Sequence, residues 1–156
     1  MQKRLLEVAK PGRPEAGRWL ELEGLAEVEL TSENPAHPIE NVLLPRGEWG
    51  WRAAEPGEQR IRLLFREPQR LRRIRLRFAE AGANRTQEFV LRWSSDAGRS
   101  FHDIVRQQYT FSPDGATSEI EDLSVDLAAV TALELTIKPD QGRGEAYASL
   151  EEWRIG

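Results

Sequence analysis

Cysteine is absent from the 156 residues of this sequence, which excludes disulfides, thiol nucleophiles and cysteine-bound zinc. Histidine is scarce as well, because His37 and His102 leave little for a histidine-based metal site. No apolar run approaches the roughly 20 residues that a membrane-spanning helix needs. Residues 1–10 lack the long apolar core of a signal peptide, so we expect a cytoplasmic protein without a membrane span.

Lysine is also scarce: Lys3, Lys10 and Lys138 are the only three, and arginine supplies nearly all of the positive charge. Arginine pairs with carboxylates and phosphates through its planar fork, although a GC-rich genome also enriches it without a functional reason. The formal net charge is −4 and the pI is about 5.4, which argues against a general nucleic-acid binder. Charged residues (31%) and apolar residues (39%) stand in the proportions of a globular chain.

What the chain has in abundance is apolar–polar alternation in its middle third. Three segments there place apolar side chains at every second position, namely Ile61, Leu63, Phe65, Ile74, Leu76, Phe78, Phe89, Leu91 and Trp93. A period of two predicts half-buried antiparallel strands, so we expect strands at 59–66 and 72–79, joined around Pro68, and at 87–94. A helix over 70–81 is the competing interpretation, and it fails because the apolar residues recur at steps of two.

Further strands are expected on both sides of this region, separated by turns rich in Pro, Gly and Asp. They cover residues 19–23, 26–30, 50–54, 101–111 with an irregularity near Asp103, 119–127, 133–138 and 146–155. A turn at 39–44 is expected beneath the core, and a short helical turn at 5–9. The predicted fold class is therefore all-β: a single jelly-roll β-sandwich of about eight to ten antiparallel strands over residues 19–156, after a lead-in at 1–18.

Several segments resemble the discoidin, or coagulation-factor type C, branch of the galactose-binding-like superfamily. The similar segments are Pro38-Ile39-Glu40-Asn41-Val42-Leu43 before Trp51, the strand at 59–65, Trp93-Ser94-Ser95-Asp96-Ala97-Gly98-Arg99-Ser100-Phe101, and Ala148-Ser149-Leu150-Glu151-Glu152-Trp153-Arg154-Ile155. Together they extend over residues 25–156. The resemblance implies an eight-stranded jelly roll with ligand loops at one end, in a family that binds glycans, phospholipid head groups or proteins and rarely catalyses.

The resemblance also implies a calcium site, at which this chain departs from the family. The family's early loop carries Asp-Gly-Asn, whereas this chain has Leu44, Pro45 and Arg46 there. The closing-strand glutamate of that site has a match in Glu152, so a structural calcium held by Glu152 is the one metal implied, and no other cofactor is predicted. A narrower likeness, over residues 40–66, is to the N-terminal domain of the scaffold protein of single-strand break repair, which is associated with nicked DNA and a repair polymerase.

No residue pattern predicts catalysis, and we expect a protein that is not an enzyme. Ser94 and Ser100 lie near His102 in the sequence, but a hairpin turns them to different faces, so we assign them to hydrogen bonds within turns. Adjacent carboxylates such as Glu151 and Glu152 alternate faces of a strand and therefore do not flank one scissile bond.

The arginines of the alternating strands leave two interpretations open. They are Arg60, Arg62, Arg73, Arg75 and Arg77. On paired strands they would make one basic face for a phosphate or an acidic partner. Alternatively, neighbouring strands supply partners across the sheet, and the acidic net charge favours this interpretation. The candidate partners are Glu27, Glu29 and Glu134.

Aromatic and polar residues near the expected end loops point to a sugar site, because an aromatic floor with a few polar groups is the usual ligand pocket. The candidate ligand-binding residues are His37, Trp49, Arg52, Arg85, Gln87 and Tyr109, with Phe111 as a further aromatic. Trp51 is instead expected to plug the mouth of the sandwich. The predicted function is a non-catalytic module that binds carbohydrate through loops at one end. The alternative is a protein-interaction or scaffold domain with a protein partner, extending to nucleic-acid repair machinery.

Overall fold

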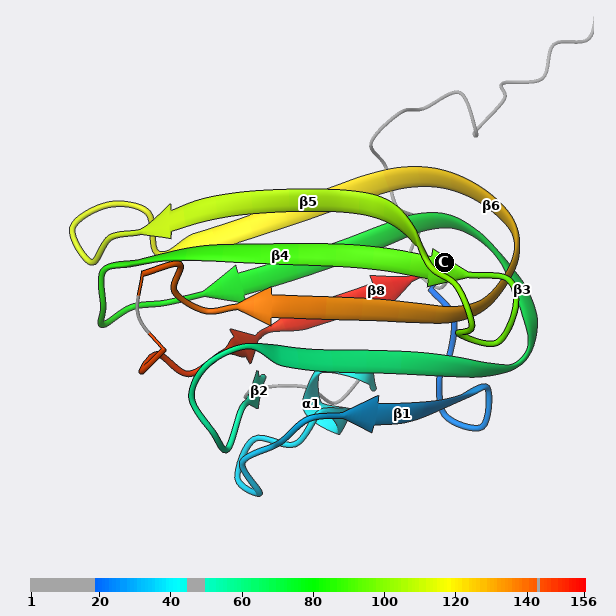
Figure 1. Cartoon of the computed structure of the whole chain (residues 1–156), viewed down its shortest axis with the longest axis horizontal. Coiled ribbons are helices and arrows are strands. Elements are labelled where there is room, and N and C mark those ends of the chain that lie inside the picture. Colours follow the sequence, from blue (N-terminus) through cyan, green and yellow to red (C-terminus); the bar gives the residue numbers. More distant parts are fainter. Residues whose placement is uncertain (1–18, 45–49, 143) are drawn as a thin grey trace, which may run out of the picture.

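The computed structural model describes residues 19–44, 50–142 and 144–156, and its regular structure is almost entirely β (Figure 1). The elements are β1 (Ala26–Leu30), α1 (Glu40–Leu43), β2 (Trp51–Arg52), β3 (Gln59–Ala79), β4 (Arg85–Ser94), β5 (His102–Phe111), β6 (Ser118–Lys138), β7 (Ser149–Leu150) and β8 (Glu152–Ile155). All strand pairs are antiparallel, so the all-β class predicted from the sequence is confirmed.

The strands form two layers that share β3 and β6. One layer has the order β1, β3, β6, β4, β5 and uses the first half of β3 and the second half of β6. The other layer pairs the second half of β3 with β8 and with the first half of β6. Figure 1 shows that β3 and β6 double back at one end of the molecule, so each strand passes from one layer into the other. The short strand β2 pairs with β7.

The passage of β3 between layers corrects the prediction of two separate strands joined around Pro68. The chain stays extended through this point, and its register against β6 slips between Leu64 and Gln69. Proline has no N–H to donate to a ladder, and a bulge is a place where a strand tolerates it. The two segments predicted for β6 are likewise one continuous strand.

Alternate side chains of the two layers face each other and form the core. The fully buried ones include Ile61, Leu63, Leu71, Ile74, Leu76 and Phe78 of β3, Phe89 and Leu91 of β4, Phe111 of β5, and Val130, Leu133, Leu135 and Ile137 of β6. Trp51 and Trp153 are also fully buried, and the indole N–H of Trp51 donates to Ser32 O over 3.2 Å. Trp51 therefore closes the sandwich as a plug, as the sequence predicts.

Two of the smaller features predicted from the sequence are confirmed. The turn at 39–44 contains the four-residue helix α1, whose last two residues are buried against the core. The irregularity near Asp103 is a bulge in β5, because Leu91 of β4 pairs with Val105 but the next residue, Arg92, pairs with Asp103.

The strand predicted at 19–23 is wrong. Leu20 N donates to Ile155 O over 2.7 Å, but a turn with Gly24 at φ 79° follows and redirects the chain before a ladder can continue. The helical turn predicted at 5–9 lies outside the described residues. None of the helices in the described ranges is long and apolar enough to cross a membrane.

Candidate functional site

Five loops gather at one end of the sandwich, on the left in Figure 1, and we call this surface the loop end. Its loops are residues 31–39, 53–58, 80–84, 112–117 and 139–148 apart from residue 143. Backbone hydrogen bonds tie them together: Asn34 N to Arg52 O (2.8 Å), Gly57 N to Ala146 O (2.9 Å), Glu80 N to Thr117 O (2.8 Å) and Gln141 N to Thr86 O (2.8 Å). The loop end is therefore a surface whose backbone is fixed from several sides.

Arg85, at the start of β4, lies beneath the loop end with only 4% of its surface exposed. Its Nε donates to Glu80 Oε1 over 2.8 Å, and Nη1 donates to Pro139 O over 2.8 Å and to Gln87 Oε1 over 3.2 Å. The guanidinium also covers the ring of Phe111, 4.8 Å from its centroid. Burial acts to raise the pKa of Glu80, but the hydrogen bonds from Arg85 and from the backbone of Gly82, together with the charge of Arg85, outweigh it and the pKa is lowered. Arg85 thus braces two of the loops from below.

Gln87 and Tyr109 are opposite each other in the β4–β5 register, just below the same loops. Gln87 is fully buried, and its Nε2 has no hydrogen-bond partner among the described residues. The hydroxyl of half-buried Tyr109 donates to Ser118 O over 3.0 Å, and its ring meets the edge of Phe111 at 5.1 Å. The structure brings Arg85, Gln87 and Tyr109 together as an interior layer beneath the loops, and their contact with a ligand stays a prediction.

His37 and Arg52 are neighbours at the rim of the loop end, because Arg52 N donates to His37 O over 3.2 Å. The side chain of Arg52 is exposed. The pKa of Glu80, which burial acts to raise and Arg85 acts to lower, is also lowered slightly by the charge of Arg52. Trp49, the aromatic residue predicted for this rim, lies outside the described residues and its role stays a prediction.

Tyr147 is the rim residue that sequence reasoning missed. It is 53% exposed, and with Ile120 it is one of two large hydrophobic side chains exposed to this degree in the described ranges. Arg52 pairs with Ser149, and the hydrogen bond from Ala53 N to Ala148 O continues that pairing, which makes Tyr147 a diagonal neighbour of Arg52. A tyrosine among small residues in a glycine-containing loop was the available signal.

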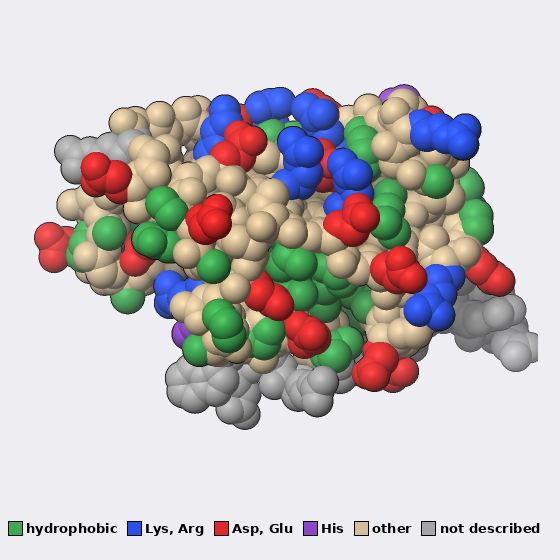
Figure 2. Space-filling view, turned by 60° about the horizontal axis from the view of Figure 1, so that its bottom comes forward, with side chains coloured by type: hydrophobic (Ala, Val, Ile, Leu, Met, Phe, Trp, Pro, Cys, Tyr) green, Lys and Arg blue, Asp and Glu red, His purple; other side chains and the backbone are tan. Residues whose placement is uncertain are grey.

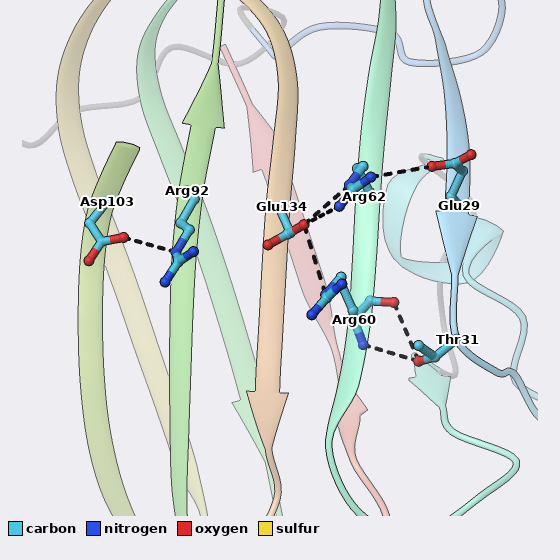
Figure 3. A network of polar contacts seen from close by, with 7 residues as sticks. All are labelled: Glu29, Thr31, Arg60, Arg62, Arg92, Asp103 and Glu134. Atoms are coloured by element: carbon cyan, nitrogen blue, oxygen red, sulfur yellow. Dashed lines mark hydrogen bonds and ion pairs between the residues drawn. The ribbon is translucent and has the colours of Figure 1, made fainter. Parts of the chain in front are cut away.

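The arginines of the first layer have carboxylate partners on neighbouring strands (Figure 3). Arg62 Nη2 lies 2.6 Å from Glu134 Oε2, and Arg62 Nη1 lies 3.9 Å from Glu29 Oε1. Arg60 Nε lies 3.9 Å from the same oxygen of Glu134. The predicted cross-strand pairing through Glu29 and Glu134 is confirmed, whereas Glu27 has no ion-pair partner among the described residues.

The prediction of one basic face is wrong, because the two groups of arginines lie on different layers. Arg60 and Arg62 belong to the first half of β3, whereas Arg73 and Arg75 belong to the second half, on the outer face of the other layer. There Arg73 Nε donates to Asp122 Oδ1 over 2.8 Å. That hydrogen bond lowers the pKa of the Asp122 carboxyl group.

Glu152, the residue predicted to hold calcium, forms an ion pair with Arg75. Its Oε1 lies 2.9 Å from Arg75 Nε. No group of three or more His, Asp or Glu side chains in the described parts of the chain is placed to hold a metal ion. Because a hard cation takes six or more oxygen ligands, Glu152 would need most of them from elsewhere, and calcium stays a prediction of the resemblance.

The fold matches solved structures of small sugar-binding modules. A family 32 carbohydrate-binding module from Clostridium perfringens, solved with GalNAc-β-1,3-galactose, is 20% identical with a TM-score of 0.59, covering 88% of this chain and 98% of that chain. A chitosan-binding module from a chitosanase/glucanase of Paenibacillus sp. IK-5 is 18% identical with a TM-score of 0.60, covering 88% and 98%. The family 32 module of AlyQ, solved with 4,5-unsaturated mannuronic acid, is 16% identical with a TM-score of 0.59, covering 85% and 95%.

This chain has the fold of the family 32 carbohydrate-binding modules. That fold is the discoidin-like, galactose-binding-like sandwich, so the architecture implied by the resemblance is confirmed. No protein-family model matches the sequence, and no curated protein matches it, so the likeness is one of fold. Some of the matching structures are larger, such as a Ruminococcus gnavus fucosidase of which the match covers 26%.

Proposed function

We propose that this chain is a non-catalytic carbohydrate-binding module that holds a glycan at its loop end. The observation that carries the proposal is that Tyr147 and Arg52 are both exposed and lie on paired segments of the rim, above the loops that buried Arg85 braces. The fold supports it, because modules of this fold were solved with GalNAc-β-1,3-galactose and 4,5-unsaturated mannuronic acid, and others bind chitosan and pectin.

A tyrosine ring and an arginine recognise a sugar by different forces. The face of the ring carries partial negative charge and attracts the C–H groups of a pyranose, while water leaves the contact. The guanidinium of Arg52 offers N–H donors to hydroxyl groups, or a bidentate pair to the carboxylate of an acidic sugar. Because an open rim provides few contacts, we expect a Kd of about 0.1–1 mM, equivalent to roughly −4 to −5.5 kcal/mol.

The carboxylates beneath the rim support binding rather than glycoside hydrolysis. A general acid needs a raised pKa, but the pKa of Glu80 is lowered, because the hydrogen bonds from Arg85 and Gly82 and the charge of Arg85 together outweigh burial. The pKa of Glu119 is raised to about 7 by burial and by a hydrogen bond with Glu121. These two glutamates contact each other on one strand, whereas the carboxylates of a glycosidase stand about 5 Å or more apart around the scissile bond.

The test is a titration of the full chain with galactose, GalNAc, chitosan oligomers and oligouronates, followed by calorimetry. At least one should bind, and Tyr147→Ala should abolish binding while Tyr147→Phe retains it, because the ring face is the contact. Ile120→Ala is the matched control, since Ile120 is 51% exposed and belongs to β6 outside the loop end. Absence of binding to every sugar, or equal losses in the alanine variants of Tyr147 and Ile120, would reject the proposal.

Two further arms of the same titration address the predictions that the structure leaves untested. Trp49→Ala should weaken binding if Trp49 adds a second aromatic contact at the rim, and it should leave the melting temperature unchanged. Repeating the titration with EDTA and with added calcium chloride tests the ion implied at Glu152. Unchanged sugar affinity and an unchanged melting temperature in both conditions would remove calcium from the proposal.

A further inference from the structure

A concave surface lies between β1 and α1, and we call it the β1 groove. It has a volume of about 340 Å³, and its floor is apolar: Leu22, Ala26, Val28, Leu30 and Leu43. Figure 2, which brings this side of the molecule forward, shows hydrophobic side chains in a hollow bordered by acidic ones. Without hydroxyl, amide or basic side chains on this floor, the groove suits an apolar segment rather than a sugar.

The surroundings of the β1 groove are acidic. Residues 19–44 contain six glutamates and neither lysine nor arginine. Glu23 and Glu40 on the rim are exposed and have no ion-pair partner among the described residues. Glu33, also on the rim, accepts a hydrogen bond from Ile39 N over 2.9 Å. An occupant that fits is therefore apolar on one side and positively charged around it.

We propose that the N-terminal segment of this chain, residues 1–18, docks in the β1 groove through Leu5, Leu6 and Val8. This segment carries five lysines or arginines against two glutamates, the reverse of the charge that follows in residues 19–44. In a helical turn, Leu5 and Val8, which are three residues apart, would lie on one face. Lys3 and Arg4 adjoin these apolar residues and would meet the rim carboxylates.

The connection makes this docking intramolecular. Leu22 and Glu23, which line the groove, are three and four residues beyond Trp19, so the segment is tethered beside the surface it would occupy. The stretch from Leu6 to Trp19 can span about 45 Å when extended, which suffices to turn back onto the groove. A short tether also gives an effective concentration in the millimolar range, so a weak contact would be populated. The inference is independent of sugar binding.

Because the chain has no cysteine, a single introduced cysteine can be labelled selectively to test this proposal. A nitroxide attached to Gln2→Cys in the full chain should broaden the NMR amide signals of Val28 and Leu43 in the groove, and leave that of Gly115 at the loop end sharp. Sodium chloride at about 0.5 M, where the screening length is roughly 4 Å, should weaken the broadening. Replacing Leu5, Leu6 and Val8 by serine should abolish it.

Charge reversal separates docking from mere proximity. Glu23→Lys together with Glu40→Lys should cause a several-fold loss of broadening at Val28, because both side chains lie on the rim. Glu27→Lys is the matched control, since Glu27 is equally exposed but alternates to the outer face of β1. Broadening confined to the neighbourhood of Trp19, or equal effects of rim and control reversals, would overturn the proposal. So would broadening between labelled and unlabelled molecules in a mixture, which would assign the groove to a second copy.

Discussion

The outer face of the first layer and the loop end use arginine in opposite ways. On the face, Arg62 and Arg92 meet carboxylates that the strand register places beside them, at 2.6 Å and 2.9 Å (Figure 3). At the loop end, Arg85 is buried under the loops while Arg52 points into solvent. The comparison teaches that an arginine on the sheet face pairs with carboxylates of neighbouring strands, whereas an exposed arginine on the rim, above the buried layer, is available to a ligand.

The largest effect should come from removing the brace under the loop end. Arg85→Ala should lower the free energy of unfolding by about 3–5 kcal/mol, because it leaves Glu80 and Pro139 O without their buried partner. Urea unfolding measures the loss. Arg70→Ala is the control, since its pair with Asp126 is exposed on both sides and should contribute about 0–1 kcal/mol. Equal losses in the two variants would contradict the distinction between brace and surface pair.

A smaller effect is expected on the sheet face, where Glu134 is the shared partner of two arginines. Glu134 is only 6% exposed, and Glu134→Ala should cost about 1–3 kcal/mol because Arg62 then loses its nearest carboxylate. A double-mutant cycle of Arg62→Ala with Glu134→Ala, followed by urea unfolding, isolates the pair from the loss of packing. A coupling energy near zero would mean that the pairing of Arg62 with Glu134 contributes nothing to the stability of the sheet face.

The carboxyl pair beneath the loops should make stability depend on pH. The folded pKa of Glu119 is about 7 against an ordinary value of 4.5, because burial and then Glu121 favour the protonated form. A raised folded pKa stabilises the fold fully below about pH 4.5, and the stabilisation is lost as pH rises through 7. Glu119→Gln keeps a neutral side chain at every pH, so it should be more stable than the parent by about 1–3 kcal/mol at pH 8 and similar to it at pH 4.5.

Thermal unfolding at both pH values measures this difference. The parent should lose stability between pH 5 and pH 8 relative to the variant, and a carboxyl ¹³C titration of Glu119 should have its midpoint near 7. The opposite order, with Glu119→Gln less stable at pH 8, would show that a charged Glu119 is required by a group in this layer.

The sequence predicted the strands well and the connection between layers poorly. Alternation places Ile61 and Ile74 inward correctly, because a half-buried strand leaves a period of two. It says nothing about how far a strand continues, since a chain that bulges at Pro68 and passes into the other layer keeps an extended backbone. Whether Arg62 and Arg73 lie on the same face of the molecule depends on that passage between layers. The local apolar–polar pattern gives no information about it.

The candidate site shows the same limit at the level of side chains. Arg85 and Gln87 were predicted as ligand contacts, and the structure buries both beneath the loops. In the sequence they alternate with Thr86 and Glu88, which are also polar. The apolar–polar alternation that identifies the buried face of a strand is therefore missing here. Tyr147 was missed because its position depends on the pairing of β2 with β7, only two residues long and distant in the chain.

The smallest effect on stability should come from the residue on which recognition depends most. Tyr147→Ala should change the free energy of unfolding by less than about 0.5 kcal/mol, because a ring that is 53% exposed buries little area in the fold. Urea unfolding of Tyr147→Ala beside Ile120→Ala measures this, and both should fall within that range. Such a result would show that the two residues have different roles: Arg85 stabilises the fold, whereas Tyr147 is left free for a ligand. A loss above about 1 kcal/mol for Tyr147→Ala alone would mean that its ring packs as part of the fold, and a loss of sugar binding in that variant would no longer report a direct contact.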